Sequence, residues 1–237
     1  TNYAQFKAGL LNSLQEVYPD YNNLEFKKSF RTDIATNSYA EVHIIIESSI
    51  GNKISIDTKS KNISSINLEI IEPVPVEENT GLDSRTEQFQ GKINPYVIRR
   101  APFDVFEIIY PLNEKSFITK HKYSLLRLSI NSNNLINKKN YLIEISLKDN
   151  SKEIQNLNFK IKVHHASIPK LIDSNFFYTN WFNINKMEEK HRLTRWDDKW
   201  YEMLEKYAKI MADGRQNCVI IPGDLISLKD NRIHLDE

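Results

Sequence analysis

The feature that most constrains this chain is a series of short segments in which apolar and polar residues alternate. Successive side chains on a β-strand point to opposite faces, so this pattern predicts strands that bury one face. The expected strands are Ser38–Ile46, Ile54–Asp57, Ile66–Ile70, Val105–Tyr110, Tyr123–Ile130, Tyr141–Leu147 and Leu157–Val163. Asn, Lys, Ser, Gly and Pro clusters between them predict turns, and many short strands favour a β-sandwich, which we place at residues 1–169.

The opening stretch Phe6–Val17 is ambiguous, because its leucines also fit a helical spacing. Tyr18-Pro19-Asp20 follows at once and ends any regular element. We favour a strand and a loop over a helix there.

The pattern changes after Ile168-Pro169, and all three tryptophans lie beyond this point. Phe176–Phe182 reads as a short aromatic strand, and Cys218–Ile221 as a fully apolar, buried one. Between them, apolar side chains recur three and four residues apart, as on one face of a helix of about 18 residues. These are Trp196, Trp200, Met203, Leu204, Tyr207, Ala208 and Met211. Thr194 and Asp197 suggest a capping box at the start of this helix, and Gly214 suggests its end.

A strand, an amphipathic helix and a buried strand make a βαβ unit, which implies a parallel sheet. We therefore expect residues 170–237 to be the start of a (β/α)₈ barrel that is truncated within this sequence. An unfinished sheet exposes an edge strand, so pairing with another copy through that edge is an expected route to an oligomer.

Composition excludes several classes of function. Lys and Arg number 32 against 31 Asp and Glu, so the basic excess of a nucleic-acid binder is missing. One cysteine excludes an intrachain disulfide, and no apolar run approaches the length of a membrane span. With six glycines there is no phosphate-cradling loop, and we expect no cofactor. No leader is visible at Thr1, which leaves secreted, periplasmic, cell-surface and cytoplasmic locations open.

Several segments, in this order along the chain, resemble a bacterial family related to glycoside hydrolase family 123, the β-N-acetylgalactosaminidases, and to a domain of unknown function, DUF4091. They are Asn12–Asp20, Tyr39–His43 (without the family's usual arginine), Asn94–Val105, Thr179–Phe182, Arg215–Pro222 and Ile233–Asp236, the last as the lead-in to a helix. The resemblance implies an N-terminal sandwich, a catalytic barrel and hydrolysis of β-linked N-acetylhexosamine glycans. It also implies a substrate-assisted mechanism, in which an Asp orients the 2-acetamido group and a neighbouring Glu is the general acid.

In that family the Asp-Glu pair follows a later barrel strand, so no catalytic residue is assigned in this chain. The acidic pairs present have simpler explanations. Asp197-Asp198 falls in the first turn of the expected helix, where carboxylates suit the helix dipole. Glu77-Glu78 and Glu188-Glu189 read as solvated loop charges.

Barrel active sites lie at the C-terminal ends of the strands. This rule selects Asn180, Trp181 and Asn183 after the first expected strand and Asp224 after the second, as candidate substrate-binding residues. A tryptophan can stack on a sugar face, and asparagine can hydrogen-bond its hydroxyl or acetamido groups. The alternative is that Trp181 packs in the core and Asn183 belongs to a turn.

Two further pairs of adjacent residues are candidates for binding an ion. His164 and His165 are neighbours on a strand and point to opposite faces, so we expect no metal site there. Arg99 and Arg100 are separated in the same way. We expect one of them to form an ion pair or hydrogen bond with the barrel, and the other to face solvent.

Two functions of different classes remain. The first is the N-terminal segment of a glycoside hydrolase, inactive by itself, whose sandwich supports the barrel. The second is a non-catalytic carbohydrate-binding or cell-surface β-sandwich protein, which would need a platform of exposed aromatic side chains on one sheet face.

Overall fold

The computed structural model describes residues 6–22, 24–78, 88–89, 92–93, 99–133, 135, 139–179, 182–219, 226–229 and 232–235. The chain divides into two compact units, residues 1–168 and residues 169–237. Each unit is described by itself below.

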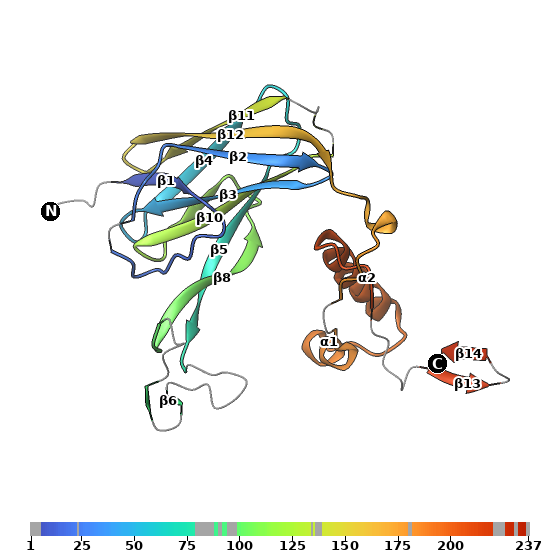
Figure 1. The fold of residues 1–237 in the computed structure, drawn as a ribbon. Coiled ribbons are helices and arrows are strands. Elements are labelled where there is room, and N and C mark those ends of the chain that lie inside the picture. The colour runs from blue at the N-terminus through green and yellow to red at the C-terminus, as the bar shows by residue number, and fades with distance from the viewer. Residues whose placement is uncertain are drawn as a thin grey trace. The chain divides into compact units, whose positions relative to one another are not determined.

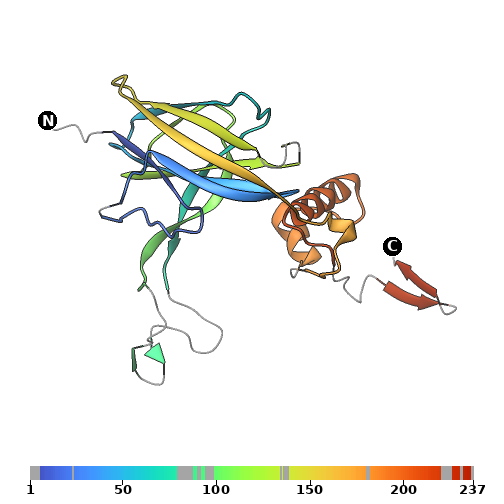
Figure 2. The ribbon, with the colours of Figure 1, turned by 45° about the horizontal axis from the view of Figure 1, so that its top comes forward.

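Two five-stranded sheets make up the first unit, and Figures 1 and 2 show them as two layers. The first sheet has the order β1-β3-β10-β5-β8 and is antiparallel throughout. Its strands are β1 (Lys7–Leu11), β3 (Tyr39–Glu47), β10 (Tyr123–Asn131), β5 (Asn67–Val76) and β8 (Phe103–Pro111).

The second sheet has the order β2-β12-β11-β4-β9. Its strands are β2 (Ser29–Thr36), β12 (Ile154–Ser167), β11 (Asn140–Lys148), β4 (Lys53–Lys59) and β9 (Ser116–Ile118). All neighbours are antiparallel except β2 and β12, which run parallel. A small antiparallel pair, β6 (Gln88–Phe89) with β7 (Lys92–Ile93), lies between β5 and β8 in the sequence.

The main core contains buried side chains from both sheets. Ile44 and Leu126 come from the first sheet, and Ile143 and Phe159 from the second, all with no exposed surface. The apolar residues of the alternating pattern are therefore those that point into the core from each strand. All seven strands expected within residues 1–169 are confirmed, and the opening stretch forms a strand followed by a loop.

A second, smaller core lies on the other face of the first sheet. Ile45, Ile71 and Leu125 are buried there beneath the segment that follows β1, which contributes Val17 and Leu24. The central strand β10 is consequently covered on both faces, which explains why its side chains are buried along almost its whole length.

The second unit is built around two helices. A 3₁₀ turn η1 (Leu171–Asp173) precedes α1 (Ile184–His191) and α2 (Asp198–Asp213). An antiparallel hairpin follows, formed by β13 (Ile226–Lys229) and β14 (Arg232–Leu235). The first three residues of the resembling segment Ile233–Asp236 belong to β14. That this segment leads into a helix stays a prediction.

The long helix exists as predicted, but its start differs. Asp197 is the N-cap, and its carboxylate accepts the Trp200 backbone N–H at 2.7 Å, so the expected cap at Thr194 is wrong. Trp196 has φ of 70°, a left-handed conformation that cannot continue a helix. Gly214 is the C-cap as expected, although the left-handed residue is the next one, Arg215.

A buried histidine on the first sheet makes stability depend on pH. The His43 side chain is 12% exposed, and burial lowers its pKa, while Glu41 raises it and Arg127 lowers it further. The unfolded chain therefore takes up this proton more readily than the folded one, so stability is lost as the pH falls below about 6.5. We expect His43→Gln to flatten the fall in the free energy of unfolding between about pH 7.5 and 5.5.

Far-ultraviolet circular dichroism during urea unfolding follows this mainly β unit. His165→Gln removes an exposed imidazole and serves as the control. Equal pH dependence in wild type and His43→Gln would contradict the assignment.

Candidate functional site

Of the four candidate substrate-binding residues, Asn183 is described, while Asn180, Trp181 and Asp224 lie outside the described residues. Asn183 is the N-cap of α1, and its side-chain oxygen accepts the Lys186 backbone N–H at 2.9 Å. This contact satisfies one of the free N–H groups at the start of the helix. The side chain is otherwise exposed to solvent, so a sugar-binding role for its amide nitrogen stays a prediction.

The two segments expected to form the first barrel strands lie beside each other. The Tyr178 carbonyl accepts the backbone N–H groups of Asn217 and Cys218, at 3.0 and 3.2 Å. In return, the Asn217 side chain accepts the Tyr178 N–H at 2.8 Å and donates to the Phe176 carbonyl at 2.9 Å. The buried Gln216 amide donates to the Cys218 carbonyl at 3.1 Å and lies 3.5 Å from the Thr179 hydroxyl. These contacts hold the residue just before Asn180 against the start of the second segment.

Neither segment has the strand geometry that the sequence predicts, where it is described. Residues 176–179 and 182 and residues 218–219 carry no strand. Phe176 and Phe177 are 74% and 79% exposed, and Val219 is 57% exposed rather than buried. A parallel pair gains its stability from neighbouring strands and from cover on both faces, and the described residues of this unit supply neither.

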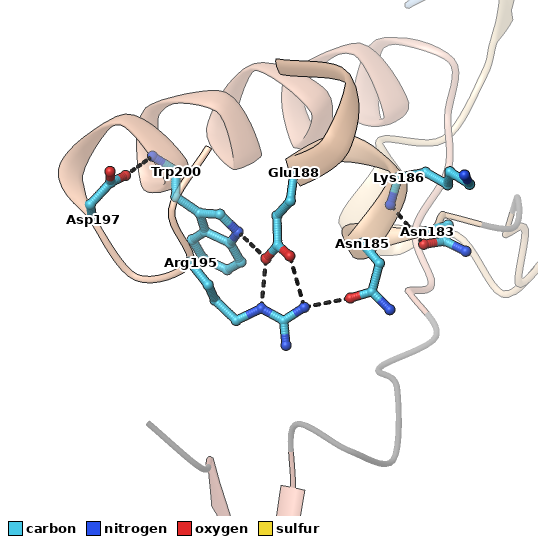
Figure 3. A network of polar contacts seen from close by, with 7 residues as sticks. All are labelled: Asn183, Asn185, Lys186, Glu188, Arg195, Asp197 and Trp200. Atoms are coloured by element: carbon cyan, nitrogen blue, oxygen red, sulfur yellow. Dashed lines mark hydrogen bonds and ion pairs between the residues drawn. The ribbon is translucent and has the colours of Figure 1, made fainter. Parts of the chain in front are cut away.

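The densest polar network of this unit joins α1, α2 and the turn between them (Figure 3). Glu188 on α1 accepts two hydrogen bonds from the Arg195 guanidinium, at 2.6 and 3.0 Å. Its carboxylate also accepts the indole N–H of Trp200 at 2.8 Å, and Arg195 donates further to the Asn185 side chain. The expectation that Glu188-Glu189 are solvated loop charges is therefore wrong: both residues are helical, and the Glu188 side chain is only 18% exposed.

The surroundings of Glu188 keep it ionised. Hydrogen bonding from Arg195 lowers the pKa of its carboxyl group, burial opposes this, and the Trp200 N–H lowers it again. A general acid needs the opposite, a raised pKa that retains the proton near neutral pH. We therefore assign Glu188 a structural role, in which it ties the helix pair to the buried Trp200.

Glu188→Gln tests this role. The amide keeps an acceptor for Trp200 but loses the ionic hydrogen bonds to Arg195, so we expect the second unit to lose about 1 to 2 kcal/mol of its free energy of unfolding. Tryptophan fluorescence during urea unfolding reports on this unit alone, since all three tryptophans belong to it.

Glu189→Gln is the matched control. Glu189 pairs with Lys186 at 2.5 Å on the exposed side of the same helix, where such pairs contribute about 0.5 kcal/mol or less. Equal losses in the two variants would contradict a special role for Glu188.

The arginine pair lies in the first unit. Arg99 forms an ion pair with Asp20, and its guanidinium stacks over Tyr18 at 4.3 Å and Phe103 at 4.9 Å from the ring centres. This partner of Arg99 belongs to the loop after β1. A contact of either arginine with the barrel stays a prediction. Arg100 is exposed, as expected for one of the two.

The described residues contain no group of three His, Cys, Asp or Glu side chains that could hold a metal ion. His164 instead lies 2.8 Å from the Asp33 carboxylate on the neighbouring strand. None of the described helices is long and apolar enough to cross a membrane.

No family model matches the sequence, and no curated protein matches it either. Solved structures do. The chain is similar to a family 123 glycoside hydrolase from Clostridium perfringens, studied for glycolipid glycan hydrolysis, with a TM-score of 0.69 and 12% identity. This match covers 90% of the chain and 37% of that hydrolase, so the chain spans little more than a third of its length.

Two weaker matches are a PapD-like domain of human CEP192 and the sporulation control protein Spo0M of Bacillus subtilis. Their identities are 8% and 7%, and they cover 69% and 79% of this chain and 87% and 56% of theirs. Their TM-scores of 0.29 carry no argument. The described part of the chain is thus mainly β, with two five-stranded sheets and two two-stranded ones. Over nine-tenths of its length the chain is similar in fold to a family 123 glycoside hydrolase.

Proposed function

We propose that this chain is the front part of a glycoside hydrolase that acts on β-linked N-acetylhexosamine glycans. In this proposal residues 1–169 are a supporting β-sandwich and residues 170–237 begin the catalytic barrel. The catalytic Asp-Glu pair would then belong to a part of the protein outside these 237 residues. The observation that carries the proposal is the fold likeness to a family 123 hydrolase across nine-tenths of the chain.

Exposed apolar side chains in the second unit support the proposal that this unit begins a barrel. Ile172, Phe176, Phe177 and Ile210 are between 68% and 91% exposed, and Val219 is 57% exposed. Water contact with this much apolar surface is unfavourable, at about 25 cal/mol for each Å². Further barrel strands and helices would cover these residues and would extend the Tyr178–Cys218 contact into a parallel pair.

The rival function, a sandwich that binds sugar through an aromatic platform, lacks support in the described part of the first unit. Its only exposed aromatic side chains there are Tyr39 and Tyr110, at 48% and 50%. Tyr39 alternates with the buried Ala40 and faces away from the main core, whereas Tyr110 pairs with Ile70, which packs against that core. The two tyrosines therefore lie on opposite faces and form no common platform.

In the proposed enzyme the substrate's own acetamido oxygen attacks the anomeric carbon, so the substrate must carry this group. We expect the product of the whole gene to release the aryl group from aryl N-acetyl-β-galactosaminide or glucosaminide. We expect no release from the aryl β-galactoside, which lacks the acetamido group, and none by the 237-residue chain.

The same assay tests whether Trp181 belongs to the substrate-binding site. Trp181→Ala in the whole gene product should raise KM by about tenfold, since stacking of a ring on an aromatic side chain contributes roughly 1 to 1.5 kcal/mol. Turnover of the N-acetyl substrates by the 237-residue chain, or equal turnover of the aryl β-galactoside, would contradict the proposal.

A further inference from the structure

A hollow of about 390 Å³ lies on the second sheet of the first unit. It is lined by Arg31, Asn140, Tyr141, Leu142, Lys160, Ile161 and Lys162. Its volume falls in the range of ligand pockets, roughly 300 to 1,000 Å³.

The strand register explains why these residues meet. Leu142 on β11, Lys160 on β12 and Arg31 on β2 are direct neighbours and form one row across the sheet. Asn140, Lys162 and Asp33 form the adjacent row. Their strand neighbours, among them Tyr141, Phe159, Ile161 and Val163, are buried in the main core. Because side chains alternate, both rows point outward from the sandwich.

The charges of the two rows are not balanced. Three cations, Arg31, Lys160 and Lys162, border the hollow, and like charges on neighbouring strands repel each other. Asp33 is the one carboxylate in the rows, and it already lies 2.8 Å from His164 and 3.6 Å from Arg31. Lys160 and Lys162 form no ion pair within 4.0 Å with any residue that the structure describes. Bound anionic charge would relieve this repulsion.

The other residues of the hollow indicate which kind of molecule would carry the anionic group. Leu142 is 42% exposed and offers an apolar contact beside the cations. The Asn140 amide can exchange hydrogen bonds with hydroxyl groups. A sugar ring presents both features, an apolar face of C–H groups and a rim of hydroxyls. The near-neutral net charge and the lack of an exposed aromatic side chain among the described residues that line the hollow disfavour a nucleic acid.

We propose that this hollow binds an acidic saccharide unit, whose carboxylate or sulfate group lies between Lys160, Lys162 and Arg31. The choice of a saccharide rests on the proposed function, whereas the preference for an anion rests on the charges alone. The sandwich then contributes to glycan selection through residues of its own.

The test titrates the isotope-labelled 237-residue chain with three disaccharides and follows backbone amide shifts by NMR. One disaccharide is a neutral N-acetylhexosamine disaccharide, one has a uronate beside N-acetylhexosamine, and one is the same uronate disaccharide with a sulfate ester. We expect the acidic disaccharides to shift the amides around Asn140, Leu142 and Lys160, and the neutral one to leave them unchanged. Comparison of the two acidic ligands tells carboxylate from sulfate recognition. Raising the salt to about 0.3 M should weaken the binding.

Lys160→Gln/Lys162→Gln is expected to lower the affinity by at least about tenfold. Lys53→Gln/Lys148→Gln is the matched control, because it removes two exposed lysines from the same sheet and should leave binding unchanged. Equal loss in both variants, no shift with either acidic disaccharide, or inorganic sulfate that competes as well as the disaccharide would each overturn the proposal. Hydrolysis by the whole gene product is measured separately, so failure here leaves the proposed enzyme standing.

Discussion

A Trp200→Ala variant is expected to lose about 3 to 5 kcal/mol of the free energy of unfolding of the second unit. Among the described residues of that unit, Trp200 is the largest buried side chain, with 2% exposure. Its ring packs against Trp196 and Tyr201, with ring centres 4.9 and 5.1 Å away, and its indole N–H donates to Glu188. Alanine would remove these contacts, leave a cavity between the helices and deprive Glu188 of one donor.

Fluorescence of the two remaining tryptophans during urea unfolding measures this loss. Trp200→Phe keeps most of the ring but not the donor, so it should lie between wild type and alanine. Tyr201→Ala, at a 52% exposed position of the same helix, should cost far less. A Trp200→Ala protein that unfolds at the wild-type urea concentration would refute the packing of α1 and α2 described above.

Gly9→Ala is expected to destabilise the first unit by about 3 kcal/mol, near the upper end of the usual cost of overpacking. Gly9 is buried in β1, and the loop that covers the second core crosses directly over it. A Cβ atom there would lie 2.5 Å from the Phe26 Cα and 2.9 Å from the Lys27 nitrogen. These are backbone atoms, so the loop itself would have to move away from the second core.

Gly51→Ala separates this steric effect from the general cost of replacing glycine. Gly51 has open space around it but a φ of +81°, so the expected loss is about 1 kcal/mol of backbone strain. Circular dichroism in urea compares the two variants. If Gly9→Ala costs no more than Gly51→Ala, the close passage of the loop over β1 is contradicted.

The strands that the sequence predicts are those whose inward positions are filled by large apolar residues, such as Ile44 on β3 or Phe159 on β12. The strand β2 is not predicted, because one of its inward positions is Thr32 and because it gains its stability by parallel pairing with β12. Such long-range pairing leaves no local periodicity in the sequence. The short strand β9 is missed for a similar reason, since three residues are too few to show a period.

Of the two helices of the second unit, the sequence predicts α2 but not α1. α2 shows a clear apolar stripe, but the eight residues of α1 bury only Met187. Its stability comes from the Asn183 cap and from the bonds between Glu188 and Arg195, a residue outside the helix. Asn183 as a capping residue, with Met187 four residues later, is the one local signal available. The many charged residues from Lys186 to Arg195 make this signal hard to recognise. For the same reason the sequence suggests a loop at Glu188.

The candidate substrate site rests on the barrel rule and on the resemblance, and of its four residues the structure describes only Asn183. Apolar runs in the sequence predict strand ends at these residues, although the described parts of both segments carry no strand. They do not tell whether the strands pair, because pairing depends on neighbours far along the chain.

Hydrogen exchange of the segments at 174–179 and 216–222 tests most directly whether residues 170–237 open a barrel. It should be measured by mass spectrometry in the 237-residue chain and in the product of the whole gene. Amides that join a completed parallel sheet should exchange at least about a hundredfold more slowly in the whole gene product. Equally fast exchange in both proteins would mean that these segments never become barrel strands, and the hydrolase proposal would be contradicted.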